Sequence, residues 1–428
     1  MHYFSTNRRS PVATFREAVL RGQPDDRGLY FPSEIPRLSA SYFDGLSRPP
    51  IADVAFDVMR PYVADEIADD RLAQICCETV DFPLPVISVS DRISTLELFH
   101  GPTMAFKDVG ARFMSRCLQE FSRENERRTL VIVATSGDTG GAVAAGFHGV
   151  EGVDVVILFP KGKVSGVQEM QLTRVGGNVI TLEVHGTFDD CQAIAKTALA
   201  DDDIKARAEV TSANSINVAR WLPQQIYYFA ILQQMNANEL VMSVPSGNFG
   251  NLAAGMLAAK SGLPIKRFIA ACNANDVVPR FLRTNEYEPR PSIQTLSNAM
   301  DVGSPSNFVR ILEMFDGDTE AIKRFLSATS ISDDETKRTI RDMYKQCNYI
   351  LDPHGAVAFR ALADDLDDDE YGVFLETAHP IKFDSVSKIL EIDIPVPNEI
   401  EKLADGSRAS IEVDNNYEAV KDLILSKI

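Results

Sequence analysis

From residue 129 onward, short runs rich in Val, Ile and Leu alternate with longer amphipathic segments. The predicted strands are Thr129–Ala134, Asp154–Phe159, Asn178–Val184, Glu239–Val244, Lys266–Cys272 and a last one at Tyr371–Glu376. Helical spacing is found over 141–148, 165–174, 188–199, 218–236 and 250–260. This alternation is typical of βαβ units, so the sequence predicts a doubly wound α/β fold with mainly parallel sheets covered on both faces.

The chain is too long for one hydrophobic core. Its 428 residues exceed the roughly 250–300 residues at which a single core stops growing. We therefore predict an N-terminal helical subdomain over residues 1–90 and two α/β domains over residues 91–235 and 236–428, which can interleave in sequence. Residues 285–350 are polar with a helical pattern.

The charge balance disfavours several kinds of partner. Lys and Arg total 43 against 61 Asp and Glu, a net charge of −18, so neither nucleic acid nor an anionic membrane is expected as a partner. No apolar run approaches the ~20 residues of a membrane helix. The six cysteines form no C-x-x-C pattern, which fits reduced thiols in a cytoplasmic protein. No H-E-x-x-H spacing occurs, so no metal site is expected.

Three loops each follow a predicted strand and open a predicted helix, where backbone N–H groups can bind an anion. The first contains Gly247, Asn248, Phe249, Gly250 and Asn251. It matches neither G-x-G-x-x-G nor the Walker pattern, so dinucleotide and nucleoside triphosphate sites are disfavoured. Because glycine turns also join strands to helices without a ligand, the loop alone leaves phosphate binding open.

The other two loops are ambiguous when taken alone. In the second, Ser136, Asp138 and Thr139 offer groups for a carboxylate, but the loop alone favours a simpler interpretation, in which Thr135, Ser136 or Asp138 caps the helix. In the third, Arg220 offers a bidentate anion contact. An arginine in a first helical turn is more often exposed.

Lys107 lies among aromatic and small residues in the segment Thr103–Asp108. Partial desolvation there would lower its pKa and supply the neutral amine that Schiff-base chemistry requires. Taken alone, one lysine among 43 basic residues is interpreted as a surface charge.

Three motifs in order resemble threonine synthase: Leu98–Asp108 (LFHGPTMAFKD), Ala134–Gly140 (ATSGDTG) and Val244–Gly250 (VPSGNFG). The resemblance continues at Arg27–Pro32, Leu296–Val302 and Glu376–Pro380, so it covers nearly the whole chain and looks like the longer bacterial and fungal branch. It implies the tryptophan-synthase-β-like fold (fold type II) and the cofactor pyridoxal 5'-phosphate. It also implies a carbon–oxygen lyase that converts O-phospho-L-homoserine and water to L-threonine and phosphate, the last step of threonine biosynthesis.

The resemblance implies a role for each motif. Lys107 would carry the cofactor as a Schiff base and act as a catalytic residue with Thr139. Residues Gly247, Asn248, Phe249, Gly250 and Asn251 would hold the cofactor phosphate, and Thr377 would meet the pyridine nitrogen. Asp138 would contact the ring 3-oxygen, where many relatives have asparagine. Two anionic oxygens side by side would require a shared proton.

The substrate would be held at both ends. Ser136 and Thr139 would bind its carboxylate, while Asn214, Ser215 and Arg220 would bind its phosphate; Lys161 or Lys163 is a further candidate for the phosphate. A monomer or homodimer is expected. The alternatives are a serine or threonine dehydratase of the same fold and a non-catalytic, synthase-like protein that binds a phosphate ligand.

Overall fold

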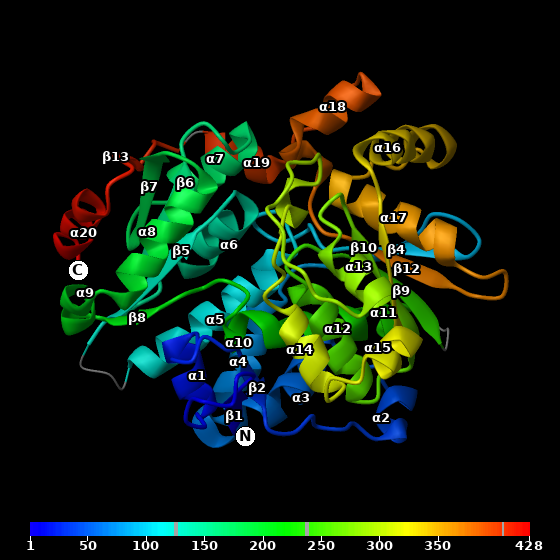
Figure 1. Ribbon diagram of the computed structural model, residues 1–428, viewed down its shortest axis with the longest axis horizontal. Helices are drawn as coiled ribbons and strands as arrows, with labels where there is room; N and C mark the ends of the chain where they lie inside the picture. Colours follow the sequence, from blue (N-terminus) through cyan, green and yellow to red (C-terminus); the bar gives the residue numbers. More distant parts are fainter. Residues whose placement is uncertain (124–126, 236–238, 405) are drawn as a thin grey trace.

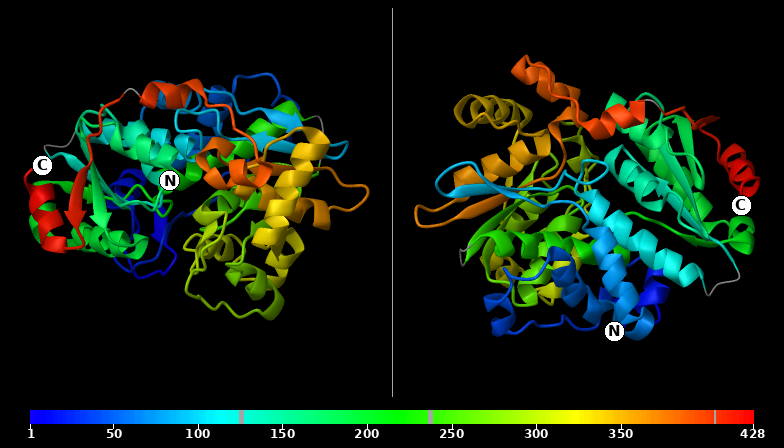
Figure 2. Two further views of the ribbon diagram at one scale, coloured as in Figure 1. Left: turned by 90° about the horizontal axis from the view of Figure 1, so that it is seen from above. Right: turned by 180° about the vertical axis from the view of Figure 1, so that it is seen from behind.

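The computed structural model describes residues 1–123, 127–235, 239–404 and 406–428. Two separate β-sheets organise the chain, one of five strands and one of six (Figure 1). Helices flank both sheets, and the N-terminal elements gather along one side of the molecule in both Figure 1 and Figure 2. Residue 236, where one predicted helix ends and one predicted domain begins, lies outside the described residues.

The five-stranded sheet is parallel throughout. Its strands, in spatial order, are β13 (Ile411–Asp414), β7 (Val179–His185), β6 (Val153–Pro160), β5 (Thr129–Ala134) and β8 (Glu209–Thr211). Val131 and Val133 belong to a core shared with α5 (Lys107–Ser122) and α6 (Asp138–Phe147), whereas Leu130 and Ile132 pack with α8 (Phe188–Ala200). Burial on both faces explains why these strands read as continuous apolar runs.

The six-stranded sheet is parallel except at one edge, where β3 and β4 are antiparallel. Its strands, in spatial order, are β11 (Leu326–Ser330), β10 (Ile265–Cys272), β9 (Leu240–Pro245), β12 (Gly372–Glu376), β4 (Ile93–Glu97) and β3 (Val86–Ser88). One face packs with α12 (Gly250–Lys260) and the other with α17 (Pro353–Asp365), which α16 (Asp333–Cys347) covers in turn. The predicted α/β fold class with mainly parallel sheets is therefore confirmed.

The N-terminal segment is mainly helical and packs on α5 and α11 (Ile226–Gln234). Its elements are β1 (Tyr3–Ser5), α1 (Phe15–Arg21), β2 (Tyr30–Pro32), α2 (Ala40–Asp44), α3 (Ile51–Val63), the 3₁₀ turn η1 (Ala64–Glu66) and α4 (Asp69–Thr79). The antiparallel pair β1–β2 was not expected from the sequence.

The remaining helices join and flank the sheets. They are α7 (Gly166–Thr173), α9 (Asp202–Arg207), α10 (Val218–Trp221), η2 (Leu222–Gln225), α13 (Val277–Thr284), η3 (Asn298–Met300), α14 (Phe308–Met314), α15 (Thr319–Phe325), η4 (Pro380–Lys382), α18 (Asp384–Leu390), α19 (Asn398–Ala404) and α20 (Tyr417–Leu425). The C-terminal helix α20 lies against α8 at the outer side of the five-stranded sheet (Figure 2).

All six predicted strands are present, as β5, β6, β7, β9, β10 and β12. Two expectations were wrong. Tyr371–Glu376 is not the last strand, because β13 follows it, and the helical pattern of 285–350 is interrupted by β11. The short strands β3, β4 and β8 were also not predicted. The strands β11 and β13 lie at sheet edges, where they pair with β10 and β7, and such short segments carry a weak local signal.

Each sheet takes strands from distant parts of the sequence. The early strand β4 pairs with β12, and the late strand β13 pairs with β7. The domain bounds at residues 90 and 236 stay a prediction.

Candidate active site

Lys107 is fixed beside Thr377 by hydrogen bonds between two segments far apart in sequence. The strands β4 and β12 are parallel neighbours, and beyond their ends the Leu98 N–H donates to the Glu376 carbonyl at 2.9 Å. The Phe106 N–H then donates to the Thr377 carbonyl at 2.8 Å. Because Lys107 follows as the first residue of α5, the end of the six-stranded sheet determines its position.

Lys107 belongs to a cluster of three charges drawn from three elements. Its Nζ lies 4.0 Å from Asp138 Oδ2, at the start of α6. Asp138 Oδ1 lies 2.7 Å from Nζ of Lys382 in η4. Lys382 is fully buried and also donates to the Thr103 carbonyl at 2.9 Å, while Gln168 Nε2 donates to Asp138 Oδ1 at 3.0 Å.

The cluster shifts the protonation equilibria of its members in opposite directions. Burial lowers the pKa of Lys107, and Lys382 and Arg220 lower it further, which outweighs the attraction of Asp138. Burial raises the pKa of Asp138, but Lys382 and Lys107 more than offset this and hold it well below its ordinary value. Asp138 is therefore an ionised carboxylate with Lys382 as its counterion.

The loop between β5 and α6 leaves two hydroxyl groups available. Thr135 Oγ1 accepts the N–H groups of Gly137 at 3.0 Å and Gly140 at 2.9 Å, so among the three capping candidates Thr135 takes that role. The hydroxyls of Ser136 and Thr139 form no hydrogen bond with any described residue. They stand free at the N-terminus of a helix, where a carboxylate is stabilised.

The loop between β9 and α12 presents unused donors. The N–H groups of residues 247–251 donate to no described acceptor, and α12 has no side-chain cap. Phe249 has the left-handed φ of 62°, a conformation that a non-glycine residue adopts at a cost and that is typical of ligand-binding loops. Asn251 Nδ2 is buried without a partner among the described residues. At Gly247 a Cβ would lie 2.5 Å from the Met300 Cα, so only glycine fits there.

The third loop, which carries Ser215, contacts the first loop, which carries Asn248. The Ser215 Oγ accepts from Asn248 Nδ2 at 2.8 Å and from Asn307 Nδ2 at 3.0 Å. With both approaches occupied by donors, the Ser215 hydroxyl proton is left for another acceptor. Arg310 fixes the positions of Ser215 and Asn307, because it donates to the Ser215 carbonyl at 3.0 Å and to Asn307 Oδ1 at 2.5 Å. The Asn214 side chain forms no hydrogen bond with the described residues.

Arg220 is not the exposed arginine that the sequence favoured when its loop was taken alone. It is 4% exposed, because its loop folds back onto α5 and its Nη1 donates to the Ala213 carbonyl at 2.9 Å. Its Nε is buried without a partner in the described chain. Burial lowers its pKa to about 10, so it remains a cation with a free donor.

The remaining basic candidates lie apart. Lys161 Nζ pairs with Glu412 at 2.5 Å, and Lys163 is exposed. The sequence missed Lys382, Gln168, Asn307 and Arg310, which contact the predicted residues directly. For Lys382 a signal exists, since it lies two residues beyond the motif Glu376–Pro380.

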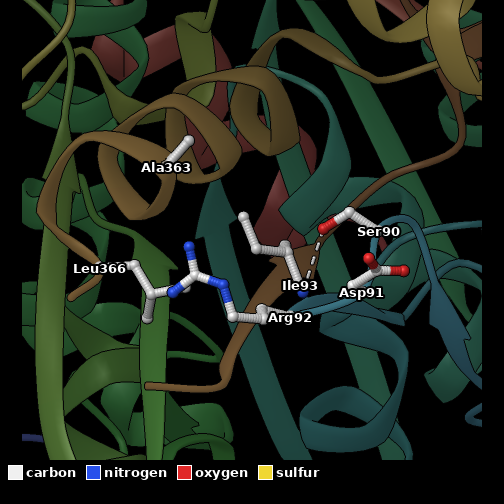
Figure 3. Close-up of a pocket in the computed structure, with 6 residues that line it drawn as sticks. All are labelled: Ser90, Asp91, Arg92, Ile93, Ala363 and Leu366. Atoms are coloured by element: carbon white, nitrogen blue, oxygen red, sulfur yellow. Dashed lines mark hydrogen bonds between the residues drawn. The ribbon is translucent and has the colours of Figure 1, made fainter. Parts of the chain in front are cut away.

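A pocket of about 210 Å³ lies at the opposite end of the six-stranded sheet (Figure 3). It is lined by the turn before β4, including Arg92, and by the end of α17. It contains none of the predicted site residues. Among the described residues no cluster of three metal-ligating side chains occurs, and no helix is both long and apolar enough to cross a membrane.

Three known protein families match parts of this chain. Residues 94–375 match the family described as pyridoxal-phosphate dependent enzyme. The flanking residues 2–80 and 355–424 match the families described as threonine synthase N terminus and threonine synthase, C-terminal.

Individual proteins agree with these families. The chain is 43% identical to threonine synthase of Serratia marcescens, covering 93% of this chain and 92% of that protein. The crystal structure of threonine synthase from Escherichia coli is 41% identical and superposes with a TM-score of 0.92, with both chains covered completely. The structure of PLP-bound threonine synthase from Brucella melitensis is 33% identical with a TM-score of 0.95, covering 100% and 99% of the two chains.

The chain is therefore a pyridoxal-phosphate-dependent enzyme of fold type II. Within that class it belongs to the threonine synthase family.

Proposed function

We propose that this chain converts O-phospho-L-homoserine and water to L-threonine and inorganic phosphate. The observation that carries the proposal is the set of unused donors in the three loops that follow strands β5, β8 and β9. These donors lie at residues 136–139, 214–220 and 247–251. Three separate groups of donors fit one phosphate of the cofactor and the two anionic ends of a phosphorylated amino acid.

The residues present fit pyridoxal phosphate. The free N–H groups of residues 247–251 and the unpaired Asn251 Nδ2 form a cradle for its phosphate. Lys107 is 17% exposed and so can be reached by a ligand. The Thr377 hydroxyl, without a partner among the described residues, would face the ring nitrogen, and Asp138 would lie near the ring 3-oxygen.

When bound, the cofactor supplies an electron-withdrawing ring that stabilises negative charge on the substrate carbons next to the amine. Lys107 as a neutral amine would take and return the protons of the α and β carbons. Its lowered pKa supports this role, since a protonated amine cannot act as a base. One amine can serve successive steps because these carbons are neighbours.

The two anionic ends of the substrate would bind to different loops. Ser136 and Thr139 would donate to the carboxylate at the N-terminus of α6. Arg220, Ser215 and Asn214 would hold the phosphate, with Arg220 supplying the charge and Ser215 its free proton. A dehydratase acting on serine or threonine needs no cation of this kind, which favours the phosphorylated substrate.

We also propose a cytoplasmic enzyme that functions as a monomer or homodimer. All six cysteines are free, which supports a reducing compartment. The net charge of −18 supports the absence of nucleic acid from its partners.

The test is a product assay. The purified chain, supplied with pyridoxal phosphate and O-phospho-L-homoserine, is expected to release phosphate and L-threonine in equal amounts. Release of 2-oxobutyrate from threonine, without release of phosphate from O-phosphohomoserine, would show that the chain is a dehydratase and that the proposed activity is wrong.

The variant Arg220→Met sharpens the assay. Loss of one charged contact to the leaving phosphate is expected to lower kcat/KM by about a hundredfold, while pyridoxal phosphate still binds. Arg283→Met is the matched control, because Arg283 is 63% exposed, and it should retain full activity.

A further inference from the structure

Lys382 is a buried lysine whose role the proposed chemistry leaves open. Its side chain has no exposed surface, and lysines are almost never fully buried unless they are paired. It lies in η4, between the segment that carries Thr377 and the helix α18. Its two contacts, Asp138 Oδ1 at 2.7 Å and the Thr103 carbonyl at 2.9 Å, both belong to loops that frame Lys107.

Asp138 has two lysines as neighbours but only one negative charge. Because Coulomb attraction falls with distance, Lys382 at 2.7 Å gains more from Asp138 than Lys107 does at 4.0 Å. Lys382 also has two hydrogen-bond acceptors, whereas Lys107 Nζ donates to no described residue. Asp138 therefore pairs with Lys382, and Lys107 is left without a close counterion of its own.

We propose that Lys382 is a positioning residue that neutralises Asp138 and thereby leaves Lys107 as the unprotonated amine of the site. The inference rests on the proposed function in one respect, namely that Lys107 is the lysine that reacts with the cofactor. Lys382 acts through Asp138 and is assigned no contact with the substrate.

The other charged groups around Lys107 act in the same direction or are already occupied. Arg220 of α10 adds a second cation that opposes protonation of Lys107. Asp108, the next residue of α5, is held by Thr103 through its N–H at 2.9 Å and its hydroxyl at 2.5 Å. Tyr227 of α11 donates its hydroxyl to the Phe106 carbonyl. Asp138 is thus the one carboxylate among the described residues that raises the pKa of Lys107.

The sign of the expected effect follows from these contacts. Without the ammonium of Lys382, Asp138 is free to pair with Lys107, so Lys107 holds its proton to higher pH. Removing Asp138 as well takes away that attraction, and burial together with Arg220 again favours the neutral amine.

The experiment measures how fast pyridoxal phosphate reacts with Lys107 of the apoprotein across a pH series. Borohydride traps the product at each time point, and the mass of the intact protein counts it. Since only the neutral amine reacts, the midpoint of the pH profile reports the pKa of Lys107.

In Lys382→Gln, which keeps a donor for the Thr103 carbonyl, the midpoint is expected to rise by about one pH unit, so that labelling below the midpoint is about tenfold slower. The double variant Lys382→Gln with Asp138→Asn is expected to return the midpoint to the wild-type value or below. Lys388→Gln, an exposed lysine on α18, is the matched control and should leave the profile unchanged. A purely structural role for Lys382 does not predict restoration by the second substitution.

Unchanged midpoints in Lys382→Gln would overturn the inference while leaving the proposed function standing, because Lys107 would still be labelled. If wild-type Lys107 were not labelled at all, the proposed function would fail and the inference with it. If Lys382→Gln does not fold, Asp138→Asn alone decides the matter, since it should lower the midpoint. A higher midpoint in Asp138→Asn would contradict the claim that the charge of Asp138 favours the protonated form of Lys107.

Discussion

Glu376, the residue before Thr377, and Asp352 place two buried carboxyl groups next to each other. The Asp352 N–H donates to Glu376 Oε1 at 2.6 Å, and neither side chain has exposed surface. Gly355 makes room for this arrangement, since a Cβ there would lie 1.4 Å from Glu376 Oε2. Burial, followed by the charge of Asp352, raises the pKa of Glu376 well above its ordinary value.

Glu376→Gln is expected to change how stability depends on pH. A raised pKa in the folded state means that wild-type stability is fully present below the ordinary glutamate pKa and is lost as pH rises toward the folded value. The variant lacks this loss, so its stability relative to wild type should increase as the pH rises above about 5, by at most about 1.4 kcal/mol per pH unit. Urea unfolding at several pH values measures it, and a pH-independent difference would contradict the buried acid.

Glu370, which lies two residues before β12, provides the opposite case. Arg267 hydrogen-bonds its carboxylate at 2.6 Å and 3.1 Å, and Lys266 lies at 3.0 Å. The hydrogen bond with Arg267, which outweighs burial, lowers the pKa of Glu370 to about 2. Glu370→Gln should cost about 2 kcal/mol at neutral pH. The cost should fade as pH drops from about 4 toward about 2, because the wild-type contact is lost there by protonation.

Thr377→Val is expected to separate activity from stability. The hydroxyl bonds to no described residue, so the melting temperature of the apoprotein should stay near that of wild type. Loss of the hydrogen bond that we propose it forms with the ring nitrogen should lower kcat about tenfold. Thr377→Ser keeps the hydroxyl and should retain most of the activity. Equal losses in both variants would argue for a packing effect.

Adjacent hydroxyls in the loop before α6 should behave differently. Ser136→Ala is expected to raise KM about tenfold by removing a donor to the substrate carboxylate, without changing stability. Thr135→Ala removes the acceptor for two N–H groups and should cost about 1 kcal/mol of unfolding free energy. Steady-state kinetics and thermal unfolding of the two variants compare them directly. A stability loss confined to Ser136→Ala would reverse the assignment.

Much of the fold could be predicted because its central strands are buried on both faces. The bounds of β5, at Thr129–Ala134, follow directly from a run of β-branched residues bounded by polar ones. Short strands such as β11 could not be found this way, since its sequence Leu-Ser-Ala-Thr-Ser carries no such run. Their form depends on tertiary pairing, which local pattern does not reveal.

The predicted site has the same limit. Glycine, threonine and asparagine residues at the ends of strands mark loops, so the three candidate loops could be selected from the sequence, and their roles stay a prediction. Lys382 and Arg310 are buried cations that a linear reading assigns to the surface. They are buried only because η4 and α14 pack against the loops. The counterion of the Asp138 carboxylate could therefore not be predicted from the sequence, since it is Lys382.

The central claim is that Lys107 is the residue that bonds pyridoxal phosphate, and peptide mapping after borohydride reduction tests it most directly. The holoenzyme is expected to yield one modified peptide, the one that contains Lys107, and Lys107→Ala is expected to yield none while keeping its fold. Modification at Lys161, Lys163 or Lys382, or unchanged labelling of Lys107→Ala, would contradict the account.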